Sequence, residues 1–327
     1  MSKPIKALLY GAVIVVTALC ALFLGRYPIP FSEIIKVLTN PAEMEKTTRI
    51  ILFTVRLPRI VAALFVGAAL AGSGAVYQTV FKNPMVSPSV LGASSGAAFG
   101  AALGLLLGFG PYMVQLMSFL SGLAAVFMAL GVSAMGKQMN KVLLLVLAGM
   151  LVSTFFTALI SLVKFLADPQ NTLPAITYWL MGSLADSDLK RGLFIGGTVI
   201  LSGIILYLLR WRISLLSLSD EEVRSMGVDP ASIRLVVVIA ATLMTSAAVS
   251  ISGVIGWVGL VVPHMVRLRG ANRFSSLLVG TLFGGGVYLL LIDTLCRVIT
   301  PVEFPLGILT SLIGAPFFAF FLLRRRK

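Results

Sequence analysis

Long runs without any charged residue dominate this chain, and short segments between them hold nearly all of its charges. A run of about 20 apolar residues crosses the ~30 Å hydrocarbon core of a bilayer as an α-helix. The pattern therefore predicts an all-α polytopic membrane protein with ten transmembrane helices in a single domain over residues 1–327. These helices are expected at 7–25, 60–81, two within 83–136, 142–163, 192–209, 235–251, a short or broken one up to 266, 274–292 and 304–323.

The distribution of Lys and Arg favours ten helices over nine. With ten spans and the N-terminus cytoplasmic, the inside segments hold 16 of the 26 basic residues and 4 of the 12 acidic ones. Treating 235–266 as one helix would move three arginines and the basic C-terminal tail outside, against the positive-inside rule. Both termini are therefore predicted to be cytoplasmic.

The first apolar run could also be interpreted as a secretory signal peptide, because Lys3 and Lys6 precede it. Its 19 uncharged residues are too long for a signal core, and no small-residue cleavage site follows. We expect it to be the first membrane helix.

Composition agrees with a membrane protein. The chain is 58% hydrophobic and 12% charged, with a mean hydropathy of +1.01, whereas soluble domains average about 25% charged residues. The net charge of +14 is explained by basic residues at span ends, so no nucleic-acid partner is predicted. Cys20 and Cys296 lie in or beside apolar runs and are expected to be packing residues.

A faint internal repeat runs through the sequence. Ser73-Gly74 precedes Pro84 by the same spacing as Ser252-Gly253 precedes Pro263, an offset of 179 residues. With ten helices, the two copies run in opposite directions, which is typical of inverted-repeat transporters. We therefore predict an inverted repeat of helices 2–5 and 7–10, although three matched positions in a Gly-rich chain could be chance.

The apolar runs offer little chemistry of their own. Lys164 and Asp293 lie near span ends, where they can reach the interface. Carriers coupled to protons or sodium generally need carboxylates or His at mid-membrane, so the energy for transport is expected to come from elsewhere. Residues 131–137 fit G-x-x-x-x-G-K, but Gln138 follows where Ser or Thr is needed, and the stretch ends a predicted membrane helix.

The residue types for an active or metal site are also missing. His264 is the only histidine and has no Cys, Asp or Glu near it in sequence. We expect a structural role for it, with no metal site, no cofactor and no catalytic nucleophile–base pair.

Residues 215–229 form the best-patterned amphipathic segment outside the apolar runs. Ser219 and Glu222 have the spacing of a capping box, the acidic side chains of Asp220, Glu221 and Glu222 suit a helix N-terminus, and Gly227 is a natural stop. Val223 and Met226 are expected to share an apolar face. The segment is therefore predicted to be a cytoplasmic docking helix at 219–227, with a merely solvated loop helix as the alternative.

Three arginines, Arg56, Arg59 and Arg297, fall on the outer side of the predicted topology. One interpretation is interfacial anchoring by snorkelling. The other is pairing with carboxylates on an external partner, which the planar guanidinium suits.

Taken together, the chain resembles permeases of the FecCD family, which belong to type II ABC importers for iron siderophores, haem and vitamin B12. The resemblance covers nearly the whole chain. It is carried by R-L-P-R (56–59), G-x-x-L-x-x-S-G (67–74), Q-x-x-x-K-N-P-M-V-S-P-S-V-L-G (78–92), L-A-G-M (147–150), W-L-M-G-S-L (179–184), G-V-I-G-W-V-G-L-V-V-P-H-M-V-R (253–267) and P-L-G-I-L-T-S-L-I-G-A-P-F-F (305–318).

The resemblance implies a homodimer in a bacterial or archaeal plasma membrane, with two separate ATP-binding subunits and an external substrate-binding protein. Arg56, Arg59 and Arg297 would form salt bridges with that protein, and the helix near 217–228 would sit in a groove of the ATPase. Asn140 falls where the family places its inner gate. The expected cargo is a metal chelate, with ferric siderophore first and haem, cobalamin or molybdate as alternatives. An ATP-independent secondary carrier is the alternative from another class.

Overall fold

The computed structural model describes residues 3–25, 27–30, 32–33, 36, 39, 44–136, 141–271, 273–299 and 303–324, and these residues form helices and loops without a strand. The helices are α1 (Lys3–Phe23), α3 (Lys46–Ile50), η2 (Ile51–Arg56), α4 (Leu57–Val80), η3 (Pro88–Leu91), α5 (Ala93–Leu106), α6 (Pro111–Met135), α7 (Lys141–Leu166), α8 (Thr172–Met181), α9 (Leu189–Leu208), α10 (Arg210–Leu215), α11 (Asp220–Ser225), α12 (Pro230–Ser252), α13 (Val258–Leu268), α14 (Phe274–Ile299) and α15 (Leu306–Arg324). Each of the ten expected apolar segments coincides with one of these helices.

Six of the described helical segments are long and apolar enough to cross a membrane: Lys46–Val80, Pro111–Met135, Lys141–Leu166, Leu189–Leu208, Pro230–Ser252 and Phe274–Ile299. The other apolar helices are shorter, namely Leu8–Phe23, Ala93–Leu106, Val258–Leu268 and Leu306–Phe321. The all-α membrane architecture expected from the hydropathy pattern is confirmed.

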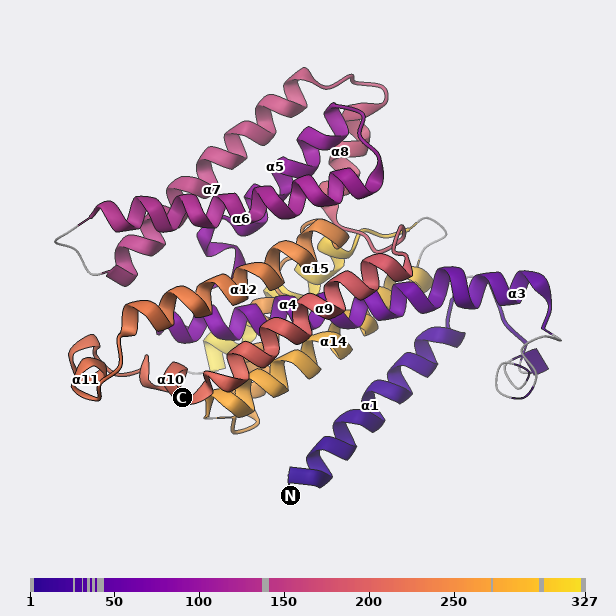
Figure 1. Ribbon diagram of the computed structural model, residues 1–327. Coiled ribbons are helices and arrows are strands. Elements are labelled where there is room, and N and C mark those ends of the chain that lie inside the picture. Colours follow the sequence, from indigo (N-terminus) through magenta and orange to yellow (C-terminus); the bar gives the residue numbers. More distant parts are fainter. Residues whose placement is uncertain are drawn as a thin grey trace.

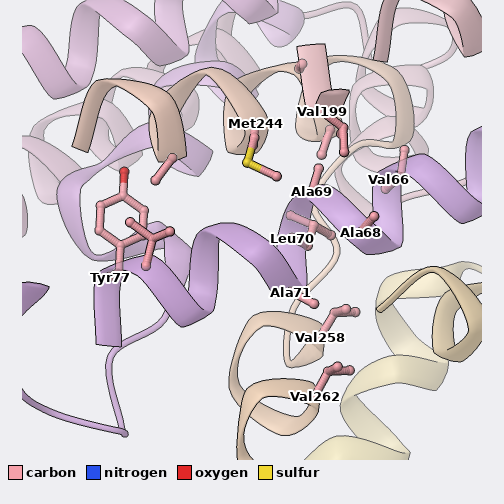
Figure 2. Close-up of a cluster of buried hydrophobic side chains, with 14 of the residues drawn as sticks. Val66, Ala68, Ala69, Leu70, Ala71, Tyr77, Val199, Met244, Val258 and Val262 are labelled. Atoms are coloured by element: carbon pink, nitrogen blue, oxygen red, sulfur yellow. The ribbon is translucent and has the colours of Figure 1, made fainter. Parts of the chain in front are cut away.

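Helix α4 lies at the centre of the bundle. It packs against α14, α12, α13 and α9, while α5, α6, α7 and α8 form a group on one side of that core (Figure 1). Almost the whole length of α4 is buried, and its small side chains meet Met244 of α12 and Val258 and Val262 of α13 (Figure 2). The Tyr77 hydroxyl lies 2.9 Å from Oγ1 of Thr242, so the polar group of this fully buried side chain is satisfied.

Glycines allow α4 to approach its neighbours at backbone distance. A Cβ at Gly67 would lie 2.1 Å from the carbonyl oxygen of Gly285 in α14, and a Cβ at Gly74 would lie 2.1 Å from that of Gly259 in α13. Without these glycines the helices could not reach this separation. Small residues at helix contacts are how membrane bundles gain van der Waals packing.

The segment 235–266 is divided as expected. Helix α12 ends at Ser252, and α13 begins at Val258. Gly253 stops α12 with a φ of 68°, and a Cβ there would lie 2.3 Å from the carbonyl oxygen of Trp179. Only glycine fits this position.

Two helices are longer than the charge pattern predicts. The helix expected at 60–81 continues N-terminally through η2 and α3 to Lys46. The π-helical turn of η2 ends two residues before Pro58, whose missing N–H interrupts regular α-helical bonding. Helix α14 extends to Ile299 instead of ending near Ile292. The expectation that Asp293 reaches the interface is wrong, because its side chain is 0% exposed inside the bundle.

The repeat offset of 179 residues does not match equivalent local structure. Ser73-Gly74 lies inside the uninterrupted helix α4, whereas Ser252-Gly253 lies where α12 ends. Pro84 follows the end of α4, but Pro263 lies within α13. These residue pairs therefore do not support the repeat.

Candidate functional site

Helix α11 is fixed at both ends by the residues expected to do so. Ser219 accepts a hydrogen bond from the Glu222 backbone N–H at 3.2 Å, and the Glu222 carboxylate accepts one from the Ser219 backbone N–H at 2.8 Å. This is a complete capping box. Gly227 has a φ of 74°, and the N–H of Val228 bonds the carbonyl of Val223, which closes the C-terminus as a Schellman motif.

The capping box also lowers the pKa of the Glu222 carboxyl. Hydrogen bonds from the Ser219 backbone N–H and then from its hydroxyl hold the pKa of the Glu222 carboxyl below its usual value. Asp220, Glu221 and Glu222 together place three carboxylates in the first turn, where the helix dipole favours negative charge.

The apolar residues of α11 do not form the shared outer face that was expected. Val223 is completely buried against the rest of the chain, whereas Met226 is 53% exposed. The expectation is therefore wrong for Val223, which anchors α11 to the bundle. Met226 is the apolar side chain of this segment that a partner can reach.

Two further contacts attach α11 to the helical bundle. Arg234 of α12 forms a salt bridge with Asp220 at 3.0 Å. Lys82, in the turn after α4, donates its Nζ to the carbonyl oxygen of Leu218. These two contacts connect the segment that contains α11 to the turn after α4 and to α12.

The three candidate docking arginines are brought together, but they are buried. Arg59 lies between two carboxylates, with Nη2 2.8 Å from Oδ1 of Asp293 and 2.6 Å from Oε1 of Glu303. The Nε of Arg297 lies 3.2 Å from Oδ2 of the same aspartate. Arg56, Arg59 and Arg297 are 4%, 6% and 8% exposed, so they are not free surface cations.

Arg56 has a different environment. Its guanidinium donates to the backbone carbonyls of Leu22 and Phe23 at the C-terminus of α1, and to that of Tyr27 beyond it. A cation suits the negative end of a helix dipole. No carboxylate pairs with Arg56 among the described residues, so the cluster of Arg56, Arg59, Arg297, Asp293 and Glu303 retains one uncompensated positive charge.

Sequence reasoning missed Asp293 and Glu303 as partners of these arginines. Asp293 precedes Arg297 by four residues in what is now a continuous helix, and that i,i+4 spacing could have indicated the pair. Glu303 approaches Arg59 through tertiary folding alone, so no local signal could have found it.

The remaining candidates are placed as follows. Asn140 lies outside the described residues. The ring centroid of His264 lies 4.9 Å from that of Phe321, and the described residues hold no group of His, Cys, Asp and Glu side chains suited to a metal ion. Cys296 is buried, whereas Cys20 lies on the exposed side of α1, contrary to the packing role expected for it.

The two candidate surfaces lie at opposite ends of the bundle. Helices α10 and α11 are at the left-hand end in Figure 1, and α3, which leads into η2 and Arg56, is at the right-hand end. Helices α4, α12 and α14 connect these ends directly. A protein with this arrangement can meet one partner at each end.

Comparisons with known proteins agree over nearly the whole chain. The model of the FecCD transport family matches residues 13–324. The molybdate import system permease MolB of Haemophilus influenzae is 38% identical over 93% of this chain and 91% of its own length. An iron chelatin transport system permease of Helicobacter pylori is 41% identical over 85% of this chain and 83% of its own length.

A solved structure gives the same result for the fold. It is described as an inward-facing conformation of a metal-chelate type ABC transporter, and it matches 98% of this chain and 100% of its own with a TM-score of 0.89 at 37% identity. The family match and this structural likeness cover the candidate surfaces at both ends of the bundle. The chain is thus an ABC importer permease and belongs to the FecCD transport family.

Proposed function

We propose that this chain is the membrane subunit of an ATP-driven importer that passes a metal chelate from an external binding protein to the cytoplasm, with the ATPase activity in a separate subunit. The observation that carries the proposal is α11, a doubly capped helix that protrudes at one end and is tied to α4 and α12. Among the described apolar helices, Asp293 is the sole carboxylate, and two arginines already hold it. The energy for transport would then come from a partner subunit that hydrolyses ATP, and α11 would be the helix on which that subunit docks.

The proposed topology has ten membrane helices with both termini cytoplasmic and an inverted repeat of helices 2–5 and 7–10. The element order supports this repeat. Helices α4, α5 and α6 follow a long, short, long pattern, and α12, α13 and α14 follow it again. Both short helices begin after a residue with positive φ, Gly92 before α5 and Trp257 before α13.

At the cytoplasmic end, α11 would sit on an ATP-binding subunit. Met226 would provide the apolar contact, and the carboxylates of Asp220, Glu221 and Glu222 would meet basic groups of that subunit. Two copies of the chain would pair with two ATPase subunits, so that the path runs between the copies. Asn140 is proposed as part of the inner gate.

At the outer end, Arg56, Arg59 and Arg297 would attract acidic side chains of the binding protein. The uncompensated positive charge of the cluster supports this role, because clustered charge steers association even where the cations are recessed. Arg59 could take a new carboxylate only by exchanging Glu303, which is the more exposed of its two partners. Docking of the binding protein would then change the ion pairs of Arg59, which also binds the buried Asp293.

Ferric siderophore is the first candidate cargo, because the relative with 41% identity carries an iron chelatin name. Molybdate is the second candidate, because MolB matches over a longer stretch of the chain. We propose a bacterial or archaeal plasma membrane as the location, in keeping with these relatives.

The test is ATPase activity in proteoliposomes that contain this chain and its ATPase partner. The binding protein would be added loaded with ferric siderophore, haem, cobalamin or molybdate. Stimulation by one loaded form is expected and would name the cargo. ATPase activity that ignores every loaded binding protein would contradict the proposal.

A further inference from the structure

A cavity of about 470 Å³ lies at the end of the bundle that carries α11. It is bounded by the C-terminus of α6, the N-terminus of α7 and the first turns of α12. Its lining residues are Leu130, Ser133, Ala134, Gly136, Lys141, Leu145, Ala231, Arg234, Leu235 and Val238. This volume falls in the range of about 300–1,000 Å³ that small-molecule sites occupy.

A buried arginine with one unpartnered N–H lines the cavity. Arg234 is only 6% exposed, and one of its guanidinium nitrogens, Nη2, binds Asp220 at 3.0 Å. Its Nε–H is buried and has no hydrogen-bond partner. Buried donors are nearly always paired, so a vacant one on a charged side chain points to a missing acceptor.

The charges that face the cavity favour an anion. Lys141 and Arg234 both line it, and the only described carboxylate in contact with either is Asp220, which engages Arg234. One positive charge therefore remains unpaired. A guanidinium and an ammonium group together suit the oxygen atoms of a phosphate.

The rest of the lining is apolar. Leu130, Leu145, Leu235 and Val238 form walls beside the cations, and Leu235 is 46% exposed on the outer side of α12. Three apolar helices begin or end here, which places the cavity at the level where the polar headgroups of a bilayer meet its acyl chains. A free inorganic anion would make no use of these apolar walls.

We propose that this cavity binds the phosphate headgroup of an acidic phospholipid. The guanidinium of Arg234 and the ammonium group of Lys141, which both line the cavity, hold the phosphate, and an acyl chain lies along the exposed apolar side of Leu235. Basic pockets between membrane helices are known to take such headgroups. Because Arg234 also binds Asp220, a single guanidinium connects the bound lipid to α11.

The test is native mass spectrometry of the purified full-length chain titrated with phosphatidylglycerol or phosphatidylcholine. The unsubstituted chain should bind phosphatidylglycerol preferentially. Arg234→Gln should weaken that binding about tenfold, since it removes a charge-assisted hydrogen bond. Arg212→Gln, at an exposed arginine of α10 outside the cavity, is the matched control and should bind normally.

A second variant guards against loss of folding. Ala134→Phe fills the cavity and leaves the Arg234–Asp220 pair in place, so it should also abolish the lipid preference without changing the thermal unfolding midpoint. Equal phosphatidylglycerol binding by both variants and the unsubstituted chain would overturn the proposal. Complete displacement of the lipid by millimolar inorganic phosphate would overturn the lipid source and assign the cavity to a free oxyanion.

Discussion

At the scale of single residues, Asp293 is the group on which the outer end of the bundle depends. Its carboxylate is fully buried and binds the guanidinium groups of Arg59 and Arg297. Taking such charges out of water is costly, and only their mutual pairing offsets the cost. Loss of the one acid would leave two buried arginines without their shared partner.

Asp293→Asn should therefore destabilise the chain by about 3–5 kcal/mol, the range seen when one member of a buried ion pair is removed. Thermal unfolding in detergent would measure it as a lowered midpoint. Asp186→Asn, at an exposed position, is the control and should leave the midpoint unchanged. An unchanged midpoint for Asp293→Asn would show that this aspartate does not hold the arginines.

Glu303 provides a separate test of the docking proposal, because it occupies Arg59 from the more exposed side. Glu303→Gln removes the competing charge, so an acidic partner should bind about tenfold more tightly if Arg59 is a docking residue. Affinity for the co-encoded binding protein can be measured by surface plasmon resonance. Weaker binding would mean that Glu303 itself contacts the partner, and the role of Arg59 would have to be abandoned.

At the scale of elements, α11 divides its two apolar side chains between the bundle and the solvent. Val223 holds the helix in place, and Met226 is left for a partner. Substituting Val223 would disturb α11 itself, so only Met226 reports cleanly on docking.

Met226→Asp should lower ATPase-subunit affinity about tenfold or more, because interfaces lose most when a buried anchor becomes charged. Co-purification of the ATPase subunit is the measurement. Met113→Asp introduces the same charge at an exposed methionine of α6 near the other end of the bundle and should retain the subunit. Retention by Met226→Asp as well would rule out α11 as the docking helix.

The capping box gives α11 a defined pH dependence. The folded-state pKa of Glu222 is lowered from its usual 4.5 by the N–H of Ser219, so its stabilising effect is fully present above about pH 4.5. That effect is lost as the pH falls through the lowered value. The protection factors of residues 219–227, which are exchange rates corrected for the intrinsic effect of pH, should fall there. In Glu222→Gln, which keeps an acceptor but cannot titrate, they should not change over the same pH range.

At the scale of the whole molecule, α4 connects the two candidate surfaces through backbone-level contacts with α13 and α14. Gly67 and Gly285 face each other so closely that neither tolerates a Cβ without a shift. A rigid central unit of this kind can carry a displacement from one end of the bundle to the other.

Gly67→Ala should force α4 and α14 apart and cost about 1–3 kcal/mol, as overpacking does. Gly197→Ala is the control, because nothing lies within 4 Å of a Cβ at that helical glycine. Both unfolding midpoints can be measured in the same detergent. A loss in both variants would point to helix propensity rather than to the contact.

Most of the helices could be predicted from the sequence, whereas fewer of the contacts in the candidate sites could. Uncharged runs located the helices because the bilayer requires continuous apolar length, and Gly253 marked a break because no other residue fits there. The ends of α4 and α14 were misplaced since Arg59 and Asp293 neutralise each other inside the bundle. The capping of α11 could be predicted because Ser219 and Glu222 are only three residues apart. The burial of Val223 could not be predicted, because it depends on tertiary packing.

The most direct test of the central claim is uptake of a radiolabelled chelate, loaded on its binding protein, into proteoliposomes that contain this chain. Uptake should require both the ATPase subunit and ATP, and it should disappear with Met226→Asp. Uptake by the chain alone, at the same rate with or without ATP, would contradict the account and identify a secondary carrier.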